Sequence, residues 1–188
     1  MCGFIGIANS ATAGAEIYDG LIAIQHRGQD AAGILTVDGE GHFHGHKDAG
    51  LVRDVFRAHH IARMVGSMGV GHVRYPTVGA GGPEDAQPFV TQFPYGIAMV
   101  HNGNVTNYEA LAGELRDRDR RLLESRCDVE IILQVFATEL ARRTEDGFSF
   151  EGYRDAVGQV LRRVKGAYSV AGVINGHGLF AFRDPFGI

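Results

Sequence analysis

The chain has 188 residues, of which 45% are hydrophobic and 21% charged, with a net charge of −4, values typical of one globular domain. This slightly acidic balance argues against a basic nucleic-acid-binding surface, and no apolar run is long enough for a membrane span. The N-terminus lacks a basic stretch followed by an apolar one, so we expect no secretory signal and a cytoplasmic protein whose two cysteines are free thiols.

Apolar periodicity in the first part of the chain predicts strands interrupted by short helices. The expected strands cover residues 3–8, 31–37, 42–46 and 68–75, and the expected helices lie around residues 17–24 and 52–64. Asp38-Gly39 between two of these strands indicates a hairpin.

The second part predicts a pair of strands, three helices and a closing pair of strands. The strands cover residues 87–92, 95–101, 167–174 and 179–183, and the helices carry apolar stripes within 108–115, 129–140 and 150–164. Thr106 and Glu109 have the spacing of a capping box, and Asn175-Gly176 indicates a turn. Many strands are apolar on both faces, so we expect two packed sheets enclosed by helices.

Cys2 directly follows the initiator methionine. By itself this position is more simply read as accidental, because most cysteines are inert. If Met1 is removed, however, Cys2 carries a free α-amine with a pKa of about 7.7–8.0, which can accept the proton of its own thiol. The sequence therefore offers a nucleophile and its base on one residue.

The segment from His101 to Asn107 (HNGNVTN) follows a predicted strand. Its simplest interpretation is a turn, since Asn-Gly is a common turn dipeptide. Alternatively, the side-chain amide of Asn102 and the backbone N–H of Gly103 supply the two donors of an oxyanion hole.

Arg74 ends an apolar strand, where a guanidinium needs a partner, either a structural carboxylate or the α-carboxylate of a ligand. The glycine-rich segment that follows, 78–82, is expected to form a loop that closes over a small ligand, and it lacks the Lys-Ser/Thr ending of a nucleotide-binding loop. Asp128 begins a predicted helix, where it either stabilises the helix dipole or holds the α-ammonium of an amino acid. Arg74 and Asp128 would together bind the two ends of a zwitterion.

Two further polar clusters have more than one interpretation. The polar segment from Gln25 to Asp30 (QHRGQD) is only partly explained by a helix that ends at Gly28. His42, His44 and His46 alternate along a strand, as zinc ligands can, but they lack a neighbouring carboxylate or cysteine, so exposed strand histidines are the better interpretation. We predict no metal site.

Several motifs occur in a specific order: Cys2-Gly-Phe-Ile-Gly-Ile7, Gln25 to Gly33, Gly71-His-Val-Arg-Tyr-Pro-Thr77, Ala86-Gln-Pro-Phe89, His101-Asn-Gly-Asn104 and Phe182 to Gly187. With them the whole chain, 1–188, resembles the class II glutamine amidotransferase domain of the N-terminal nucleophile hydrolases, and within it the amidophosphoribosyltransferase group. The resemblance implies an α+β fold, a four-layer αββα sandwich. The family often has Ser-Asp-Ser-Glu around its amine-binding aspartate, whereas this chain has Ser125-Arg-Cys-Asp-Val-Glu130.

The resemblance also implies roles for individual residues. Cys2 would be the nucleophile, with Asn102 and Gly103 as the oxyanion hole. Arg74 would bind the glutamine carboxylate and Asp128 its amine. The remaining expected contacts position Cys2 or surround the substrate, and they are Arg27, Gly28, Tyr75, Thr77 and His101.

The resemblance further implies that ammonia from glutamine serves a synthase site, with phosphoribosylamine formation from phosphoribosyl pyrophosphate in purine biosynthesis as the first expectation. The partner would be a phosphoribosyltransferase or other synthase domain or subunit, and a homo-oligomer is left open. We expect no cofactor in this segment, while Mg²⁺ would belong to the phosphoribosyltransferase domain and any iron–sulfur cluster would have its ligands largely elsewhere. The alternatives are a stand-alone subunit that serves another acceptor, such as a glutamate-synthase-like partner, or a binding module that keeps only the fold.

Overall fold

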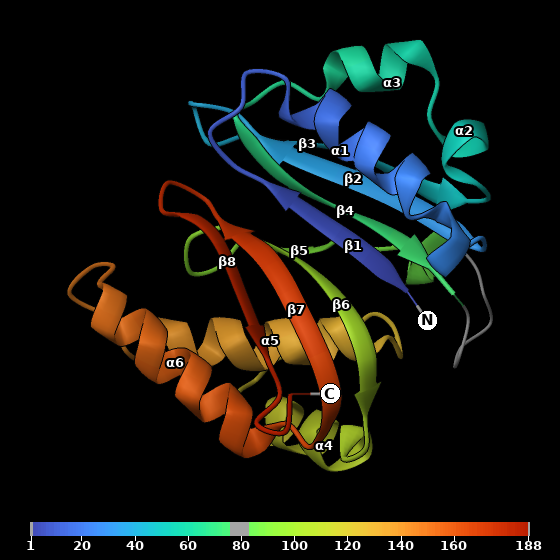
Figure 1. The fold of residues 1–188 in the computed structure, drawn as a ribbon. Coiled ribbons are helices and arrows are strands. Elements are labelled where there is room, and N and C mark those ends of the chain that lie inside the picture. Colours follow the sequence, from blue (N-terminus) through green and yellow to red (C-terminus); the bar gives the residue numbers. More distant parts are fainter. Residues whose placement is uncertain (1, 76–82, 188) are drawn as a thin grey trace.

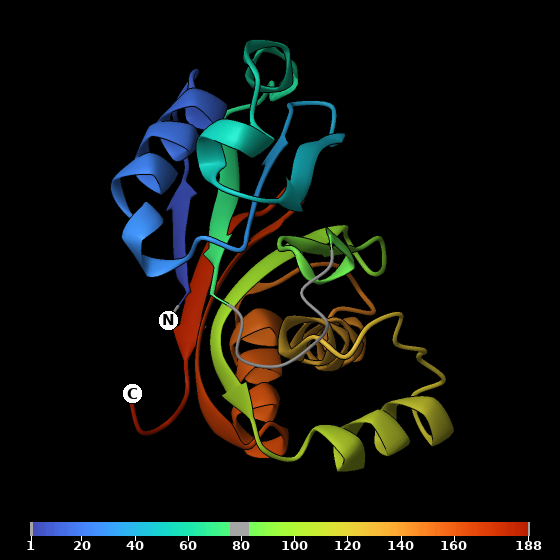
Figure 2. The ribbon, with the colours of Figure 1, turned by 90° about the vertical axis from the view of Figure 1, so that its right-hand side faces the viewer.

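The structure is a computed structural model that describes residues 2–75 and 83–187. In this part of the chain the strands form two antiparallel four-stranded sheets that face each other. One group of helices covers the outer face of each sheet (Figures 1 and 2). The predicted four-layer αββα sandwich is therefore confirmed.

The first sheet has the strand order β1-β4-β2-β3. Its strands are β1 (Gly3–Ile7), β4 (Met68–Arg74), β2 (Ala31–Val37) and β3 (Phe43–Ala49). β2 is buried at every position, which explains its continuous apolar sequence, whereas β3 is an edge strand whose residues are half-buried or exposed.

The second sheet has the order β5-β6-β7-β8. Its strands are β5 (Phe89–Thr91), β6 (Ile97–Val105), β7 (Gly166–Ile174) and β8 (Gly178–Arg183). β7 and β8 form the predicted hairpin, in which Gly176 has a φ of 75°. The predicted strand at 87–92 is shorter than expected.

Helices α1 (Ala13–Ala23), α2 (Val52–Val55) and α3 (Ala58–Arg63) lie over the first sheet. Helices α4 (Tyr108–Asp117), α5 (Asp128–Ala141) and α6 (Phe150–Arg163) lie over the second (Figure 1). Short 3₁₀ turns follow α1 at Gln25–Arg27 and precede β5 at Pro83–Asp85. No helix among these has the length and apolar character that a membrane span requires.

Three hydrophobic clusters fill the spaces between the layers. Leu35, Val70, Val100 and Val173 belong to the cluster between the sheets, so residues of both sheets share one core. The cluster around Phe136 packs α5 and α6 on the second sheet, and the cluster of α1 packs on the first. This burial of both sheet faces is the main stabilising contribution.

The prediction of one continuous helix over residues 52–64 is wrong, because the structure has two short helices there. The chain is extended at Phe56 and Arg57, which separates α2 from α3. Phe56 is buried, and its ring packs edge-on against Tyr18 at a centroid distance of 6.2 Å. The apolar spacing is compatible with one helix. In the structure, however, Phe56 reaches the core from an extended stretch of backbone between two short helices.

The predicted capping box is also absent. Helix α4 begins after Asn107, whose side chain makes no cap bond and instead accepts from Lys165 N–H and donates to Arg163 O, both at 2.9 Å. The Thr106 hydroxyl donates to the Lys165 carbonyl at 3.2 Å. These tertiary contacts to the junction of α6 and β7 replace the local reciprocal cap.

Candidate active site

Cys2 lies directly before β1, at the end of the first sheet. The antiparallel register pairs Gly3 with Val73, so Cys2 lies opposite Arg74 and close to Tyr75, the residue after β4. The Tyr75 N–H donates to Cys2 Sγ at 3.4 Å, and Sγ lies 3.6 Å from the Tyr75 carbonyl oxygen. The sheet register thus fixes the position of the thiol.

Arg27 contacts Cys2, and Gly28 packs against the end of β4. The Arg27 Nε donates to the Cys2 carbonyl at 3.1 Å. A Cβ atom on Gly28 would lie 2.6 Å from the carbonyl carbons of Val73 and Arg74, closer than real contacts allow. Glycine therefore permits the turn after α1 to pass against the end of β4.

Arg74 is 5% exposed and lies between two carboxylates. Its guanidinium contacts Asp30 Oδ2 at 2.6 Å and Asp85 Oδ2 at 3.3 Å. The structural ion pair, one of the two sequence interpretations, is thus present. A substrate carboxylate would have to bind the Arg74 guanidinium while Asp30 and Asp85 also contact it.

The segment 101–105 is not the turn that its composition suggested. It continues β6, where Asn102 pairs with Ser169 and Gly103 with Tyr168 of β7. Gly103 has a φ of 145°, and a Cβ atom there would lie 2.1 Å from the Ala167 carbonyl oxygen. The strand therefore requires glycine at this position.

A cavity of about 50 Å³ lies beside Cys2 and contains most of the predicted site. Its described lining residues are Cys2, Arg74, Tyr75, Gln87, His101, Gly103, Arg126, Cys127 and Asp128. A neighbouring cavity of about 260 Å³ also borders Cys2, and Arg27 and Asn102 line that one. Asn102 and Gly103 thus approach Cys2 from adjoining sides. Thr77 and the predicted loop 78–82 lie outside the described residues.

Asp128 is the first residue of α5 and accepts a hydrogen bond from Val105 N–H at 2.8 Å. Burial raises the pKa of its carboxyl group, and the Val105 hydrogen bond opposes this effect. Among the ion pairs of the described residues none includes Asp128. A positively charged group in the cavity would therefore stabilise its ionised form.

His101 lines the cavity as a neutral side chain. It is 4% exposed, and burial lowers its pKa to about 4. Its backbone N–H donates to Gln87 Oε1 at 2.6 Å, and its carbonyl accepts from His72 Nε2 at 3.1 Å. The pKa of His72, which is fully buried, is lowered to about 3, also chiefly by burial.

Sequence reasoning missed Gln87, Arg126 and Cys127 as cavity residues. Gln87 was visible only as part of a motif, and Arg126 and Cys127 only as neighbours of Asp128. Burial raises the pKa of the Cys127 thiol to about 11, so this thiol stays protonated at neutral pH. Nothing in the local sequence pattern indicates this burial, because it arises from packing of distant segments.

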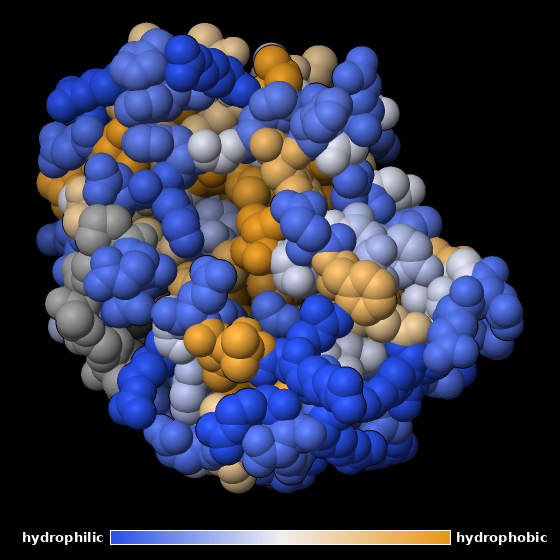
Figure 3. Space-filling view, turned by 180° about the vertical axis from the view of Figure 1, so that it is seen from behind, coloured by the Kyte–Doolittle hydropathy of each residue, from blue (hydrophilic) through white to orange (hydrophobic). Residues whose placement is uncertain are grey.

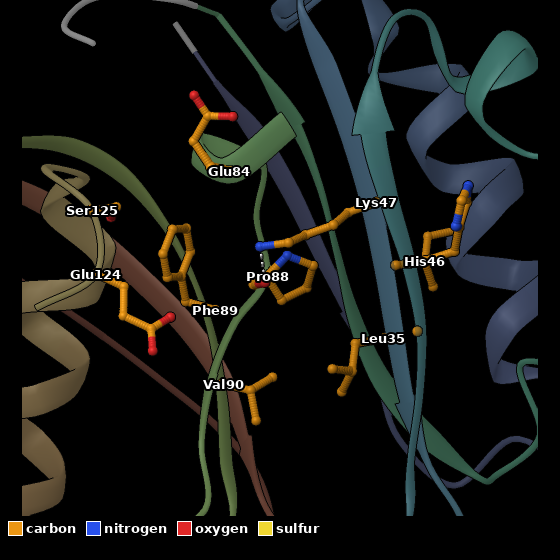
Figure 4. A pocket seen from close by; sticks show the side chains of 11 residues that line it. Leu35, His46, Lys47, Glu84, Pro88, Phe89, Val90, Glu124 and Ser125 are labelled. Atoms are coloured by element: carbon orange, nitrogen blue, oxygen red, sulfur yellow. Dashed lines mark hydrogen bonds between the residues drawn. The ribbon is translucent and has the colours of Figure 1, made fainter. Parts of the chain in front are cut away.

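A larger cavity, of about 770 Å³, lies between the edge strands β3 and β5 and contains none of the predicted site residues. The Lys47 ammonium donates to the carbonyls of Ala86 and Pro88 there and lies over the Phe89 ring (Figure 4). Seen from behind, hydrophobic residues line a hollow near the middle of the molecule (Figure 3).

The alternating histidines do not form a shared site. The expectation that no carboxylate neighbours these histidines is wrong, because His44 contacts Asp38 Oδ2 at 2.7 Å. His46 instead stacks on His60 at a centroid distance of 3.8 Å. Within the described residues no group of three or more His, Cys, Asp or Glu side chains is arranged to hold a metal ion.

Comparison with known proteins gives one consistent family. Residues 73–188 match the family described as "Glutamine amidotransferase domain". Among curated proteins, the amidophosphoribosyltransferases of Escherichia coli and Pseudomonas aeruginosa are 46% and 47% identical to this chain, over 100% and 98% of its length. The chain spans 37% of the length of each of these relatives.

Two solved structures agree with this result. One is a glutamine phosphoribosylpyrophosphate amidotransferase from B. subtilis, complexed with ADP and GMP. It matches with a TM-score of 0.81 and 30% identity, and the match covers 100% of this chain and 38% of the B. subtilis chain. A structure titled as the allosteric regulatory enzyme of purine biosynthesis has a TM-score of 0.76 and 32% identity, and covers 92% of this chain and 35% of its own.

Proposed function

This chain belongs to the class II glutamine amidotransferase domain family, and from that premise we propose that it hydrolyses glutamine to glutamate and ammonia with Cys2 as nucleophile. The observation that carries this proposal is the cavity beside Cys2. Separate segments of the chain bring to it a thiol, hydrogen-bond donors and side chains of both charges. That combination fits an amino acid whose side-chain carbonyl carbon is attacked.

Glutamine would bind as a zwitterion. Its α-ammonium would pair with Asp128, a partly buried carboxylate whose pKa is raised by burial. Its α-carboxylate would contact Arg74, held in place by Asp30 and Asp85. Tyr75, Thr77 and His101 would complete the walls around the substrate. Opposite charges at the two ends would orient the γ-carboxamide toward Cys2.

The nucleophile would form within Cys2 itself. After removal of Met1, the α-amine accepts the thiol proton, directly or through one water. The Tyr75 N–H already donates to the sulfur and would stabilise the thiolate. The Arg27 bond to the Cys2 carbonyl and the close packing of Gly28 would limit the rotation of the terminal residue.

The thiolate would then attack the γ-carbon of glutamine, and the amide oxygen would gain negative charge. Asn102 and the Gly103 N–H would donate to that oxygen. Collapse of the tetrahedral intermediate breaks the C–N bond, and the protonated α-amine returns its proton to the leaving ammonia. Water hydrolyses the γ-glutamyl thioester to glutamate and regenerates the thiol.

The ammonia would serve a synthase site on a partner domain. The relatives named above are amidophosphoribosyltransferases that extend well beyond the matched region. We therefore propose a phosphoribosyltransferase partner that uses the ammonia and phosphoribosyl pyrophosphate to make phosphoribosylamine for purine biosynthesis, in the cytoplasm. The glutamine half-reaction would use this chain's own residues, and any Mg²⁺ would act at the partner site.

A glutaminase assay with matched cysteine variants tests the first part of the proposal. The wild-type protein should release glutamate from glutamine, Cys2→Ala should release none, and Cys127→Ala should stay active because its protonated thiol takes no part. Activity retained in Cys2→Ala would contradict the assignment. For the second part, the full-length protein should release pyrophosphate from phosphoribosyl pyrophosphate when glutamine is present, and failure to do so would exclude this acceptor.

A further inference from the structure

Glu130 carries a buried carboxylate that is not among the residues lining the small cavity beside Cys2, yet it organises one of the cavity's walls. Glu130 lies in the first turn of α5 and is 5% exposed. The wall in question is the segment 124–127, which leads from the α4–α5 connection into Asp128. Figure 4 shows Glu124 and Ser125 on this segment at the start of α5.

Both oxygens of Glu130 accept hydrogen bonds from this segment. Oε1 accepts from Glu124 N–H at 2.7 Å, and Oε2 accepts from Ser125 N–H at 2.7 Å and from the Ser125 hydroxyl at 2.6 Å. The Glu130 carboxylate therefore accepts three hydrogen bonds. In this way the backbone N–H groups of Glu124 and Ser125, which lie near the helix N-terminus, are paired.

The hydrogen bonds continue from Ser125 toward the cavity. The Ser125 Oγ accepts from Cys127 N–H at 3.1 Å while its own proton goes to Glu130. Cys127 lines the cavity and directly precedes Asp128. A second bond, from the Tyr108 hydroxyl to the Ser125 carbonyl at 2.8 Å, fixes the same residue from the opposite side.

From these contacts we propose that Glu130 is a positioning residue for glutamine binding, one that holds Cys127 and Asp128 at the amino-group end of the cavity through Ser125. The inference rests on the proposed function. Glu130 touches neither substrate nor the reacting atoms, so its loss should weaken binding of the amino acid without changing the chemistry at Cys2.

The substitution Glu130→Gln tests this most closely, because it keeps the size of the side chain. A glutamine amide has one acceptor oxygen, and its NH₂ group would face a donor of Ser125 or Glu124. We expect the KM for glutamine in the full-length protein to rise about tenfold, as loss of charge-assisted hydrogen bonds predicts. The kcat should stay within about twofold of the wild type.

Glu139→Gln is the matched control. Glu139 lies on the same helix, is also 5% exposed, and accepts from Arg142, Arg143 and Arg163 rather than from the cavity wall. It should lower the melting temperature and leave the KM for glutamine unchanged. An unchanged KM in Glu130→Gln, or a KM rise equal to that in Glu139→Gln, would overturn the proposal.

Labelling of Cys2 gives an independent readout. In Glu130→Gln, a diazoketone analogue of glutamine should label Cys2 more slowly than in the wild type, because it needs the amino-group contact. Iodoacetamide, which lacks an amino-acid end, should label Cys2 at the wild-type rate. Equal slowing with both reagents would mean a general disturbance and would contradict the proposal.

If Glu130→Gln does not fold, the variant Ser125→Ala tests the proposed positioning role instead. It removes the link to Cys127 N–H but keeps the two backbone bonds to Glu130, so a smaller rise in KM, about threefold, is expected. A wild-type KM in Ser125→Ala would refute the inference. Failure of the underlying function would look different, since the wild-type protein itself would then show no glutamine turnover.

Discussion

Cys2 and Cys127 line the same small cavity, yet only one of them is suited to be a nucleophile. The Cys2 sulfur accepts the Tyr75 N–H, whereas burial raises the pKa of the Cys127 thiol to about 11. Because the thiolate is the reactive form, proximity to the substrate alone does not make Cys127 reactive.

Alkylation should therefore distinguish the two cysteines. At pH 7.5 iodoacetamide should modify Cys2 and leave Cys127 intact, and the loss of glutaminase activity should follow modification of Cys2. Peptide mass spectrometry over a time course measures both sites. Modification of Cys127 before Cys2 would contradict this account of the two thiols.

Replacement of Asp128 by Asn should separate stability from function. The folded-state pKa of Asp128 is raised, so its ionised form is less favourable in the folded than in the unfolded protein. This penalty is fully present above the raised pKa and vanishes below the ordinary value of 3.8. Asp128→Asn should thus melt at a higher temperature at pH 7, but not at low pH, while its KM for glutamine rises. A lower melting temperature at pH 7 would contradict the burial argument.

The same shift predicts how glutamine binding depends on pH. Pairing with the α-ammonium requires ionised Asp128, so affinity should be constant near neutrality and fall as the pH drops through the raised pKa. In Asp128→Asn this loss of affinity at low pH, the acid limb of the pH profile, should be absent. Because kcat/KM also follows the titration of the Cys2 α-amine, the dissociation constant of glutamine is measured against pH in Cys2→Ala, with and without Asp128→Asn. Identical acid limbs in the two proteins would assign the titration to another group.

Arg74→Ala should affect both folding and binding, in contrast to Asp128→Asn. Its removal leaves Asp30 and Asp85 without their shared cation, and breaking a buried pair costs about 3–5 kcal/mol. We expect a melting temperature lower by several degrees. If Arg74 also binds the substrate carboxylate, the KM of the protein that remains folded should rise about tenfold or more. A lower melting temperature with an unchanged KM would leave Arg74 with a structural role alone.

Asn102→Ala should lower kcat by about 10²–10³ and change KM little, because an oxyanion donor acts mainly in the transition state. Gly103→Ala should instead disturb the pairing of β6 with β7, since its Cβ atom would overlap the Ala167 carbonyl. Steady-state kinetics and thermal melting of the two variants test this contrast. A normal kcat for Asn102→Ala would remove it from the oxyanion hole.

The sequence predicted the sheet layers well, because strands buried on both faces, such as β2, have a continuous apolar pattern. Its errors lie where tertiary contacts override local signals. Phe56 interrupts a helix-compatible pattern to reach the core, and Thr106 bonds to Lys165 instead of forming a cap. Likewise, the Asn-Gly pair at 102–103 is typical of a turn but lies in a strand, since β7 supplies a long-range partner.

Several residues that line the cavity beside Cys2 could be named from the sequence, but the electrostatics of that cavity could not. Cys2, Gly103 and Asp128 do line one cavity, as their proposed roles require. The ion pairs of Arg74 and the burial of Cys127 arise from packing between segments distant in sequence, which local patterns do not encode. The role of Glu130 was likewise hidden, because an acidic residue in a first helical turn is ordinarily explained by the helix dipole.

The central claim is that glutamine is cleaved through a thioester on Cys2, and trapping that intermediate tests it most directly. The wild-type protein would be mixed with glutamine, quenched in acid within the first turnover, digested and examined by mass spectrometry. The account predicts one γ-glutamyl group on the peptide that begins at Cys2, with Met1 absent. A γ-glutamyl group on Cys127, or active molecules that retain Met1, would contradict it.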